Sequence, residues 1–166
     1  MAKNRTLAAI AAGVFLAFAI AASAADKHPE GAIAARLLDI KWKDGPFPGS
    51  KAALLAGDPK TGMHHTYLKL PDGAFVPPHW HSADEYVTVV QGIVLFGTGD
   101  DADRDKTRLY AAGAFVYMPA GVRHFAWAKG EVVLSQTRGG PIDFNWVHPE
   151  DAPKVAPAAT TPAENK

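Results

Sequence analysis

Short apolar runs rich in β-branched and aromatic residues alternate with clusters of proline and glycine from Lys41 onward. Runs of this length, separated by regular turn signals, are typical of the strands of an all-β sandwich or barrel. No stretch between them is long enough for the helix that joins two parallel strands, which disfavours a parallel α/β sheet. The expected strands contain residues 66–70, 86–90, 93–96, 114–118 and 132–136.

The start of the chain has the pattern of a removable export signal, residues 1–24. Lys3 and Arg5 precede an alanine-rich apolar run over residues 7–22, and residues 22–24 read Ala-Ser-Ala, a small-x-small cleavage pattern. The alternative is an uncleaved membrane anchor. An anchor needs about 20 apolar residues, whereas this run is shorter and rich in weakly hydrophobic alanine. We therefore expect a periplasmic or secreted protein that does not contact the membrane after cleavage.

Cleavage leaves 142 residues, enough for one domain and too few for two separate cores. Residues 25–40 form a polar lead, and its last part, residues 32–40, fits either a helical turn or an edge strand. We expect the β-barrel domain over residues 41–149. Residues 150–166 consist mainly of proline, alanine, threonine and charged residues, which predicts a disordered tail.

The charge and the absence of cysteine restrict the partners and the chemistry. The chain after residue 24 carries 15 basic and 17 acidic residues with no run of lysine or arginine, so nucleic acid is not an expected partner. The chain contains no cysteine, which excludes disulfides and thiolate metal sites. Any bound metal must therefore be held by nitrogen and oxygen.

Two histidines one residue apart are followed four residues later by a glutamate. On a strand His79 and His81 point the same way, with their Cα atoms roughly 6.6 Å apart. On one straight strand Glu85 would lie roughly 20 Å from His79, too far to share an ion. The chain is therefore expected to turn at residues 82–84, so that a second strand begins at Glu85 and runs to a turn at Gly92.

Three ligands leave a divalent ion underfilled, and His124 is the best placed candidate for a fourth. An apolar run meets a Pro-Ala-Gly turn there, and the histidine then begins the next strand. His28 lies in the polar lead and His148 lies near the tail. His64 and His65 are adjacent, so on a strand they face opposite sides.

The predicted metal ligands are His79, His81, Glu85 and His124. Buried together without a cation, three imidazoles and a carboxylate would leave costly unpaired polar groups. Nitrogen and oxygen donors suit Fe(II), Mn(II), Ni(II), Cu(II), Co(II) and Zn(II), and affinity order does not choose among them. Octahedral coordination by four ligands leaves two positions open to water, O₂ or substrate.

The spacing of these residues resembles the cupin superfamily. Its first signature is matched by Gly73-x5-His79-x-His81-x3-Glu85-x6-Gly92, and its second by Gly113-x5-Pro119-x-Gly121-x2-His124. The second signature usually ends in asparagine, where this chain has Ala128, a departure that concerns strand packing rather than the metal. Other phrases of the sequence resemble small single-domain bacterial cupins and are similar to the cupin part of metal-binding anti-sigma factors.

This resemblance implies a double-stranded β-helix, also called a jelly roll, with the metal inside the barrel. It favours iron or manganese as the bound ion and leaves zinc, nickel and copper open. Because many cupins pair through sheet edges, it also suggests a homodimer.

Open coordination positions indicate catalysis rather than a closed structural site. The leading interpretation is an exported metal-dependent enzyme that acts on a small polar substrate, through a dioxygenase-type oxidation or an isomerase or lyase step. The alternative is a non-catalytic module that binds or senses a metal or ligand. No catalytic residue is assigned. Tyr67, Gln136 and Arg138 are the nearest candidates for the barrel wall, and the pattern leaves open which face of their strands points inward.

Overall fold

The computed structural model describes residues 32–153, and in this range it consists of β-strands, turns and three short 3-10 helices, without an α-helix. The predicted signal (residues 1–24) and residues 154–166 of the predicted tail lie outside the described residues. Within residues 32–153 no helix is long and apolar enough to cross a bilayer.

The strands are β1 (Lys43–Asp44), β2 (Lys51–Gly57), β3 (His64–Leu70), β4 (Phe75–Trp80), β5 (Glu85–Thr98), β6 (Arg108–Ala111), β7 (Phe115–Met118), β8 (His124–Arg138) and β9 (Asn145–Trp146). The 3-10 helices are η1 (Leu37–Asp39), η2 (Arg104–Lys106) and η3 (Pro149–Asp151). Every expected strand segment overlaps an observed strand. Residues 32–40 contain the helical turn η1 rather than an edge strand, and η3 extends into the segment that was predicted to be tail.

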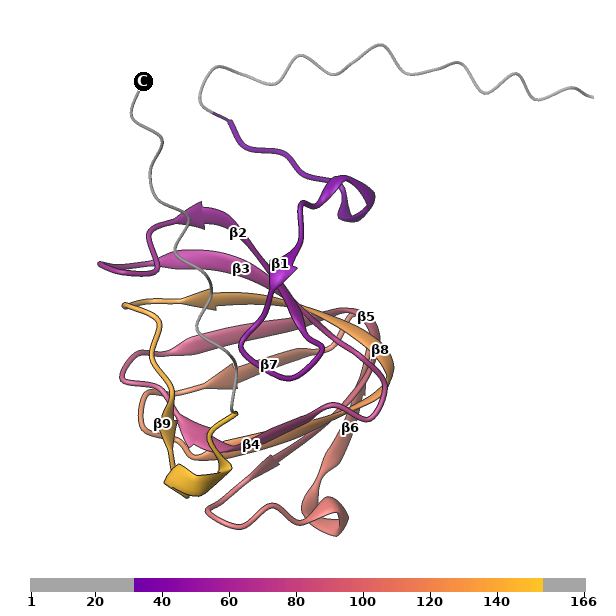
Figure 1. Ribbon diagram of the computed structural model, residues 1–166, viewed down its shortest axis with the longest axis vertical. Coiled ribbons are helices and arrows are strands. Elements are labelled where there is room, and N and C mark those ends of the chain that lie inside the picture. Colours follow the sequence, from indigo (N-terminus) through magenta and orange to yellow (C-terminus); the bar gives the residue numbers. More distant parts are fainter. Residues whose placement is uncertain (1–31, 154–166) are drawn as a thin grey trace, which may run out of the picture. The chain divides into compact units, whose positions relative to one another are not determined.

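The longest strands, β5 and β8, run antiparallel to each other and hold the sheet together. The first half of β5 pairs with β7 and with the end of β8. From the end of β8 the sheet continues through β3 and β2 to β1. The second half of β5 pairs with β6 and with the start of β8. From the start of β8 the sheet continues through β4 to β9. The two halves curl over a shared interior (Figure 1), so the all-β jelly roll predicted from the sequence is confirmed.

β5 passes between these halves at Gly92. The sequence predicted a turn there, and this was wrong, because β5 continues through Gly92 with register shifts against β8 on either side. Gly92 has a φ of 81°, and a Cβ at this position would lie 2.2 Å from the carbonyl oxygen of Glu131. Glycine therefore bends the strand from one half of the sheet to the other without reversing it.

Alternate side chains of the strands form the core between the two halves. The register pairs Leu68 with Leu134 and Val89 with Leu134, and all three side chains are buried. Ala128, where the cupin signature usually has asparagine, is also buried in this core. The core consists of Phe47, Leu68, Leu70, Val76, Val87, Val89, Val94, Phe96, Met118, Ala126, Ala128, Val132 and Leu134.

Candidate metal centre

The four predicted ligands lie together in the interior, next to this core. His79 is near the end of β4 and His81 follows that strand, whereas Glu85 begins β5 and His124 begins β8. Each of the four side chains is 2–3% exposed. The predicted break between the two histidines and the glutamate is confirmed, since β4 ends at Trp80 and β5 begins at Glu85.

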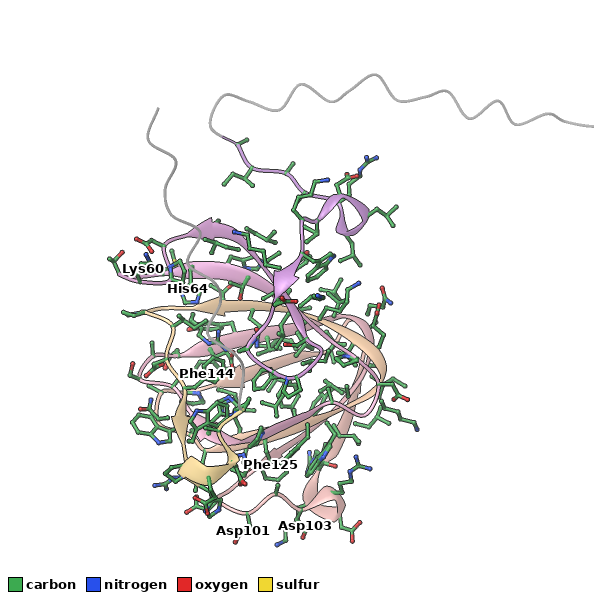
Figure 2. The ribbon with its side chains drawn as sticks, viewed as in Figure 1. Lys60, His64, Asp101, Asp103, Phe125 and Phe144 are labelled. Carbon is green, nitrogen blue, oxygen red and sulfur yellow. The ribbon has the colours of Figure 1, made fainter. Side chains whose placement is uncertain are left out.

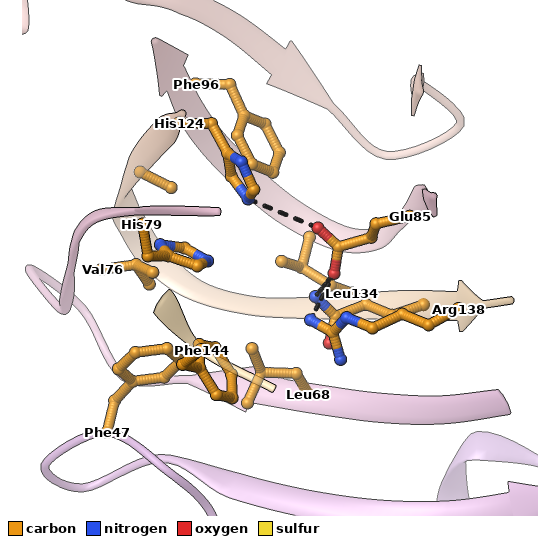
Figure 3. A pocket seen from close by; sticks show the side chains of 12 residues that line it. Phe47, Leu68, Val76, His79, Glu85, Phe96, His124, Leu134, Arg138 and Phe144 are labelled. Carbon is orange, nitrogen blue, oxygen red and sulfur yellow. Dashed lines mark hydrogen bonds and ion pairs between the residues drawn. The ribbon is translucent and has the colours of Figure 1, made fainter. Parts of the chain in front are cut away.

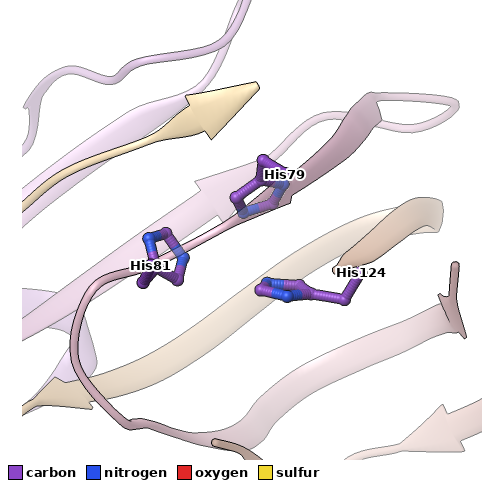
Figure 4. Close-up of side chains that lie close together, drawn as sticks. All are labelled: His79, His81 and His124. Atoms are coloured by element: carbon purple, nitrogen blue, oxygen red, sulfur yellow. The ribbon is translucent and has the colours of Figure 1, made fainter. Parts of the chain in front are cut away.

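The three imidazoles converge on one space (Figure 4). The ring centroids of His79 and His124 lie 4.3 Å apart, those of His79 and His81 4.9 Å, and those of His81 and His124 5.4 Å. Each ring offers one nitrogen to a group whose members lie within 4.8 Å of one another. Such a group can hold a metal ion.

Hydrogen bonds to the backbone fix which nitrogen of each ring is free. A carbonyl oxygen only accepts hydrogen bonds, so each bonded Nδ1 carries the proton and Nε2 keeps its lone pair. The acceptors are the carbonyl oxygens of Pro77 for His79 (2.7 Å), Asp143 for His81 (2.6 Å) and Val122 for His124 (2.9 Å). This pattern, with Nδ1 donating to a carbonyl and Nε2 left as a ligand, is the one that metal-binding histidines use.

Glu85 divides its two oxygens between the histidines and a second polar group. Its Oε2 lies 3.4 Å from His124 Nε2 and 3.6 Å from His81 Nε2. Its Oε1 accepts hydrogen bonds from Gln136 Nε2 at 3.0 Å and from Arg138 (Figure 3). Oε2 and the imidazole lone pairs are all acceptors, so a cation between them is what this arrangement favours.

Burial sets the protonation states of these groups. Together with the imidazoles of His124 and His81, burial lowers the pKa of His79 from 6.5 to about 3. Burial is also the main cause that lowers the pKa of His81 to about 4, with Glu85 acting in the opposite direction. Burial alone would raise the pKa of Glu85, but Arg138 and His124 outweigh it and bring that pKa to about 2. His79 and His81 are thus neutral and Glu85 anionic at neutral pH, the states that bind metal.

Gln136 and Arg138 both face inward, which settles the orientation that the sequence left open. They lie two and four residues beyond Leu134 on β8, and Gln136 is 8% and Arg138 3% exposed. Arg138 Nη2 also lies 3.4 Å from His81 Nε2. Tyr67, the third candidate for the wall, is adjacent to the inward-facing Leu68 and lies on the outer face with His65.

His79, Glu85 and His124 border a narrow cavity inside the barrel. Its volume is about 20 Å³. By the same measure a single buried water needs about 10–15 Å³. Gln136 and Arg138 are the polar groups of its lining besides the metal-site residues. The apolar lining consists of Phe47, Leu68, Val76, Phe96, Ala126, Leu134 and Phe144.

The segment after β8 closes the site, a role that the sequence gave no signal for. The Asp143 carbonyl accepts the bond from His81, and the Asp143 carboxylate accepts one from Asn145 Nδ2 at 2.8 Å. The ring of Phe144 stacks on Trp146 at 5.4 Å and meets Phe47 edge-on at 5.7 Å. β9 then pairs with the end of β4. This aromatic cover limits access of water to the histidines.

Comparison with known families and structures agrees with this architecture. Residues 55–136, about half of the chain, match the family described as Cupin. The polyketide cyclase RemF from Streptomyces resistomycificus is similar in structure with a TM-score of 0.58, at 18% identity over 72% of this chain and 88% of that one. A RmlC-like cupin from Shewanella frigidimarina gives 0.53, at 19% identity over 66% and 91%. KdgF from Halomonas sp. gives 0.51, at 22% identity over 63% and 90%. At these identities the likeness concerns the fold.

One curated sequence also aligns with the chain. It is the DNA-directed RNA polymerase subunit beta' of Micrococcus luteus, 30% identical over 134 residues, or 80% of this chain. The chain spans about a tenth of that subunit's length.

Proposed function

The chain belongs to the cupin superfamily, and we propose that it is an exported metal-dependent enzyme acting on a small polar substrate. The ligands of the ion would be His79, His81, His124 and Oε2 of Glu85. The observation that carries this proposal is the set of three imidazoles whose Nδ1 atoms are bonded to carbonyls while their Nε2 atoms turn to a common space.

The donor set limits the ion without choosing it. Three neutral nitrogens and one carboxylate oxygen suit several divalent metals, with iron or manganese favoured and zinc, nickel or copper open. When bound, such an ion supplies positive charge to an oxygen-bearing substrate and, if it is iron, reactivity with O₂.

The chain's own residues contribute position and shielding. Gln136 and Arg138 hold one oxygen of Glu85, which leaves the other directed at the histidines. Phe47 and Phe144 cover the cavity, so a substrate there would meet few competing waters. Electrostatic interactions are stronger in such a dry site than at the surface.

The reaction class is either a dioxygenase-type oxidation or a non-oxidative isomerase or lyase step. The similar polyketide cyclase is an enzyme with this architecture. Export to the periplasm or the exterior is part of the proposal, and the pattern of residues 1–24 supports it. A homodimer is the proposed assembly, to be checked by sedimentation.

The size of the cavity favours one further candidate. A volume of about 20 Å³ also suits a module that binds the ion and a very small ligand without turnover. Such a binding or sensing module would have no product to release and no need of a wider opening.

The test separates these functions. Chelator-treated protein is dialysed against each candidate ion, its metal content is measured, and the loaded forms are screened against diketones, thiols, catechols and sugar acids with O₂ uptake and product recorded. We expect one ion per chain and turnover with one metal. Binding of an ion with ligand affinity but no turnover would favour the sensing module, and a chain that stays empty would overturn both.

A further inference from the structure

A second hollow lies on the inward face of the sheet, between the edges of β6 and β7. Among the described strands both pair only with β5, so no hydrogen-bonded neighbour closes the space between them. The hollow has a volume of about 320 Å³, within the roughly 300–1,000 Å³ of small-molecule sites. It is therefore large enough for a ligand that the metal-site cavity of about 20 Å³ does not hold.

The pairing of the strands explains why this hollow has apolar walls. Arg108 of β6 pairs with the inward-facing Phe96 of β5, and Tyr110 follows two residues later on the same face. The rings of Phe96 and Tyr110 meet edge-on, with their centroids 6.1 Å apart. Val116 and Met118 of β7 complete the apolar part of the lining. Two rings and two aliphatic side chains suit the flat or apolar body of a small molecule.

The charge around the hollow is positive. Lys106 and Arg108 line it, and no acidic residue of the described chain does. Lys106 Nζ lies 3.3 Å from the carboxylate of Asp103, in the segment that the labels Asp101 and Asp103 mark in Figure 2. Arg108 has no ion pair within residues 32–153. A guanidinium binds a carboxylate through two parallel N–H···O bonds, so Arg108 is the group available to an organic acid.

The hollow adjoins the metal centre. Phe96 lines both the hollow and the metal-site cavity (Figure 3). Two further lining residues are register neighbours of predicted metal ligands, because Met118 pairs with Glu85 and Thr98 pairs with His124. The two spaces thus share one wall, and the groups that line the hollow are complete without an ion.

We propose that this hollow is a binding site for a small organic acid, whose carboxylate binds Arg108 and whose apolar body packs against Phe96, Tyr110 and Met118. The site lies beside the metal centre and goes beyond the proposed function, because it does not require the ion. Its test is therefore made on metal-free protein.

Titrations at pH 7 in the presence of chelator compare benzoate with two related probes. Benzamide keeps the ring and lacks the charge, whereas acetate keeps the carboxylate and lacks the ring. We expect benzoate to bind roughly fivefold or more tightly than either probe. Benzamide loses the charge-assisted bonds to Arg108, and acetate loses the apolar contacts.

The methyl signals of ¹³C-labelled methionine locate the bound acid. Met118 is 6% exposed and lines the hollow. Met63 is 70% exposed and borders a different hollow beside the β2–β3 turn, so it serves as the internal control. We expect benzoate to shift the Met118 signal, which is assigned by its loss in Met118→Leu, and to leave the Met63 signal in place.

Three variants isolate the role of Arg108. Arg108→Gln removes the charge and should lose the preference for benzoate over benzamide. Arg108→Lys keeps the charge without the planar fork and should retain part of that preference. Arg104→Gln is the matched control and should behave as the wild type. Arg104 does not line the hollow, and its Cζ lies 5.1 Å from the ring centroid of Trp127.

Equal affinity of benzoate and either probe in the wild type would overturn the site. So would a Met118 signal that does not move at saturating benzoate, or a preference that Arg108→Gln leaves unchanged. Loss of the preference in Arg104→Gln as well would overturn the assignment to Arg108. Failure of this site would leave the metal proposal standing, and a chain that takes up no ion would leave this site standing.

Discussion

The two sides of the candidate metal centre are held in place in different ways. On the histidine side, His79 and His124 each donate Nδ1–H to a carbonyl two residues earlier, so short segments orient these rings. On the carboxylate side, Glu85 is held by Gln136 and Arg138, which lie 51 and 53 residues away in the sequence. The orientation of His79 and His124 therefore depends on local geometry, whereas Glu85 depends on the register of β5 with β8 and His81 on a bond to Asp143, 62 residues away. Damage to the first should mainly affect metal binding, and damage to the second should also affect stability.

The pH dependence of stability separates the two sides most strongly. The folded pKa values of His79 and His81, about 3 and about 4, lie below the usual 6.5. The unfolded chain then binds protons that the folded chain does not, so stability falls as the pH drops below 6.5. We expect each histidine to contribute a loss of about 3 kcal/mol between pH 7 and pH 4 in the presence of chelator.

The contribution of Glu85 to stability changes only at lower pH than that of the histidines. The pKa of Glu85 is lowered from 4.5 to about 2, so its contribution is present above pH 4.5 and is lost as the pH falls toward 2. Urea denaturation at stepped pH measures both phases. His79→Asn should reduce the dependence above pH 4.5, and stability that stays flat from pH 7 to pH 4 would contradict the protonation states described above.

Replacement of Arg138 should destabilise the fold itself. Arg138→Met removes the cation beside a carboxylate that is 2% exposed, and leaving such a charge unpaired costs about 3–5 kcal/mol. Denaturation in chelator at pH 7 measures the loss. The double variant Glu85→Gln with Arg138→Met should recover most of it. Arg123→Met, at an exposed pair with Asp100, should cost less than about 1 kcal/mol. Equal effects at the two arginines would show that the Glu85 pair is unimportant.

Loss of a histidine ligand should mainly weaken metal binding rather than destabilise the fold. Loss of a residue that only supports a metal ligand typically weakens metal affinity about 10–100-fold. His79→Ala removes a ligand itself, so we expect it to weaken metal affinity by more than this. Isothermal titration with Mn²⁺ or Zn²⁺ measures this. His148→Ala is the control, because His148 is exposed and bonds to the Asp100 carbonyl away from the site. An affinity that His79→Ala leaves unchanged would remove His79 from the ligand set.

Replacement of Gln136 should have a smaller effect than the pH change, the replacement of Arg138 or the loss of His79. It donates one hydrogen bond to Glu85 Oε1, which Arg138 also binds. Gln136→Leu removes that bond and is expected to lower metal affinity about tenfold without changing the stoichiometry. A loss as large as that of His79→Ala would mean that Gln136 binds the ion or the site collapses without it, and denaturation would distinguish these cases.

The contrast between short-range and long-range contacts explains how much of the fold and the site the sequence predicts. The alternation of apolar runs and glycine-rich turns predicts the all-β class, and the motif spacing brings His79, His81, Glu85 and His124 to one place. These signals are short-range, because each ligand is introduced by its own strand end or turn. The bend at Gly92 was misread, since a glycine with positive φ serves a continuing strand as well as a turn.

The inward direction of Gln136 and Arg138 could not be predicted, for a physical reason. A shift of one residue in the pairing of β8 would exchange its two faces, and only long-range pairing fixes that register. The inward position of His64 likewise follows from its pairing with Arg138 across β3 and β8. The cover by Phe144 also depends on a contact between distant segments, with Phe47.

Crystals loaded with Mn²⁺ and analysed by anomalous scattering test the central claim most directly. The account predicts one ion per chain, about 2 Å from Nε2 of His79, His81 and His124 and from Oε2 of Glu85. Glu85 Oε1 should remain with Gln136 and Arg138. An ion bound elsewhere, or no ion between these four side chains at saturating metal, would contradict it.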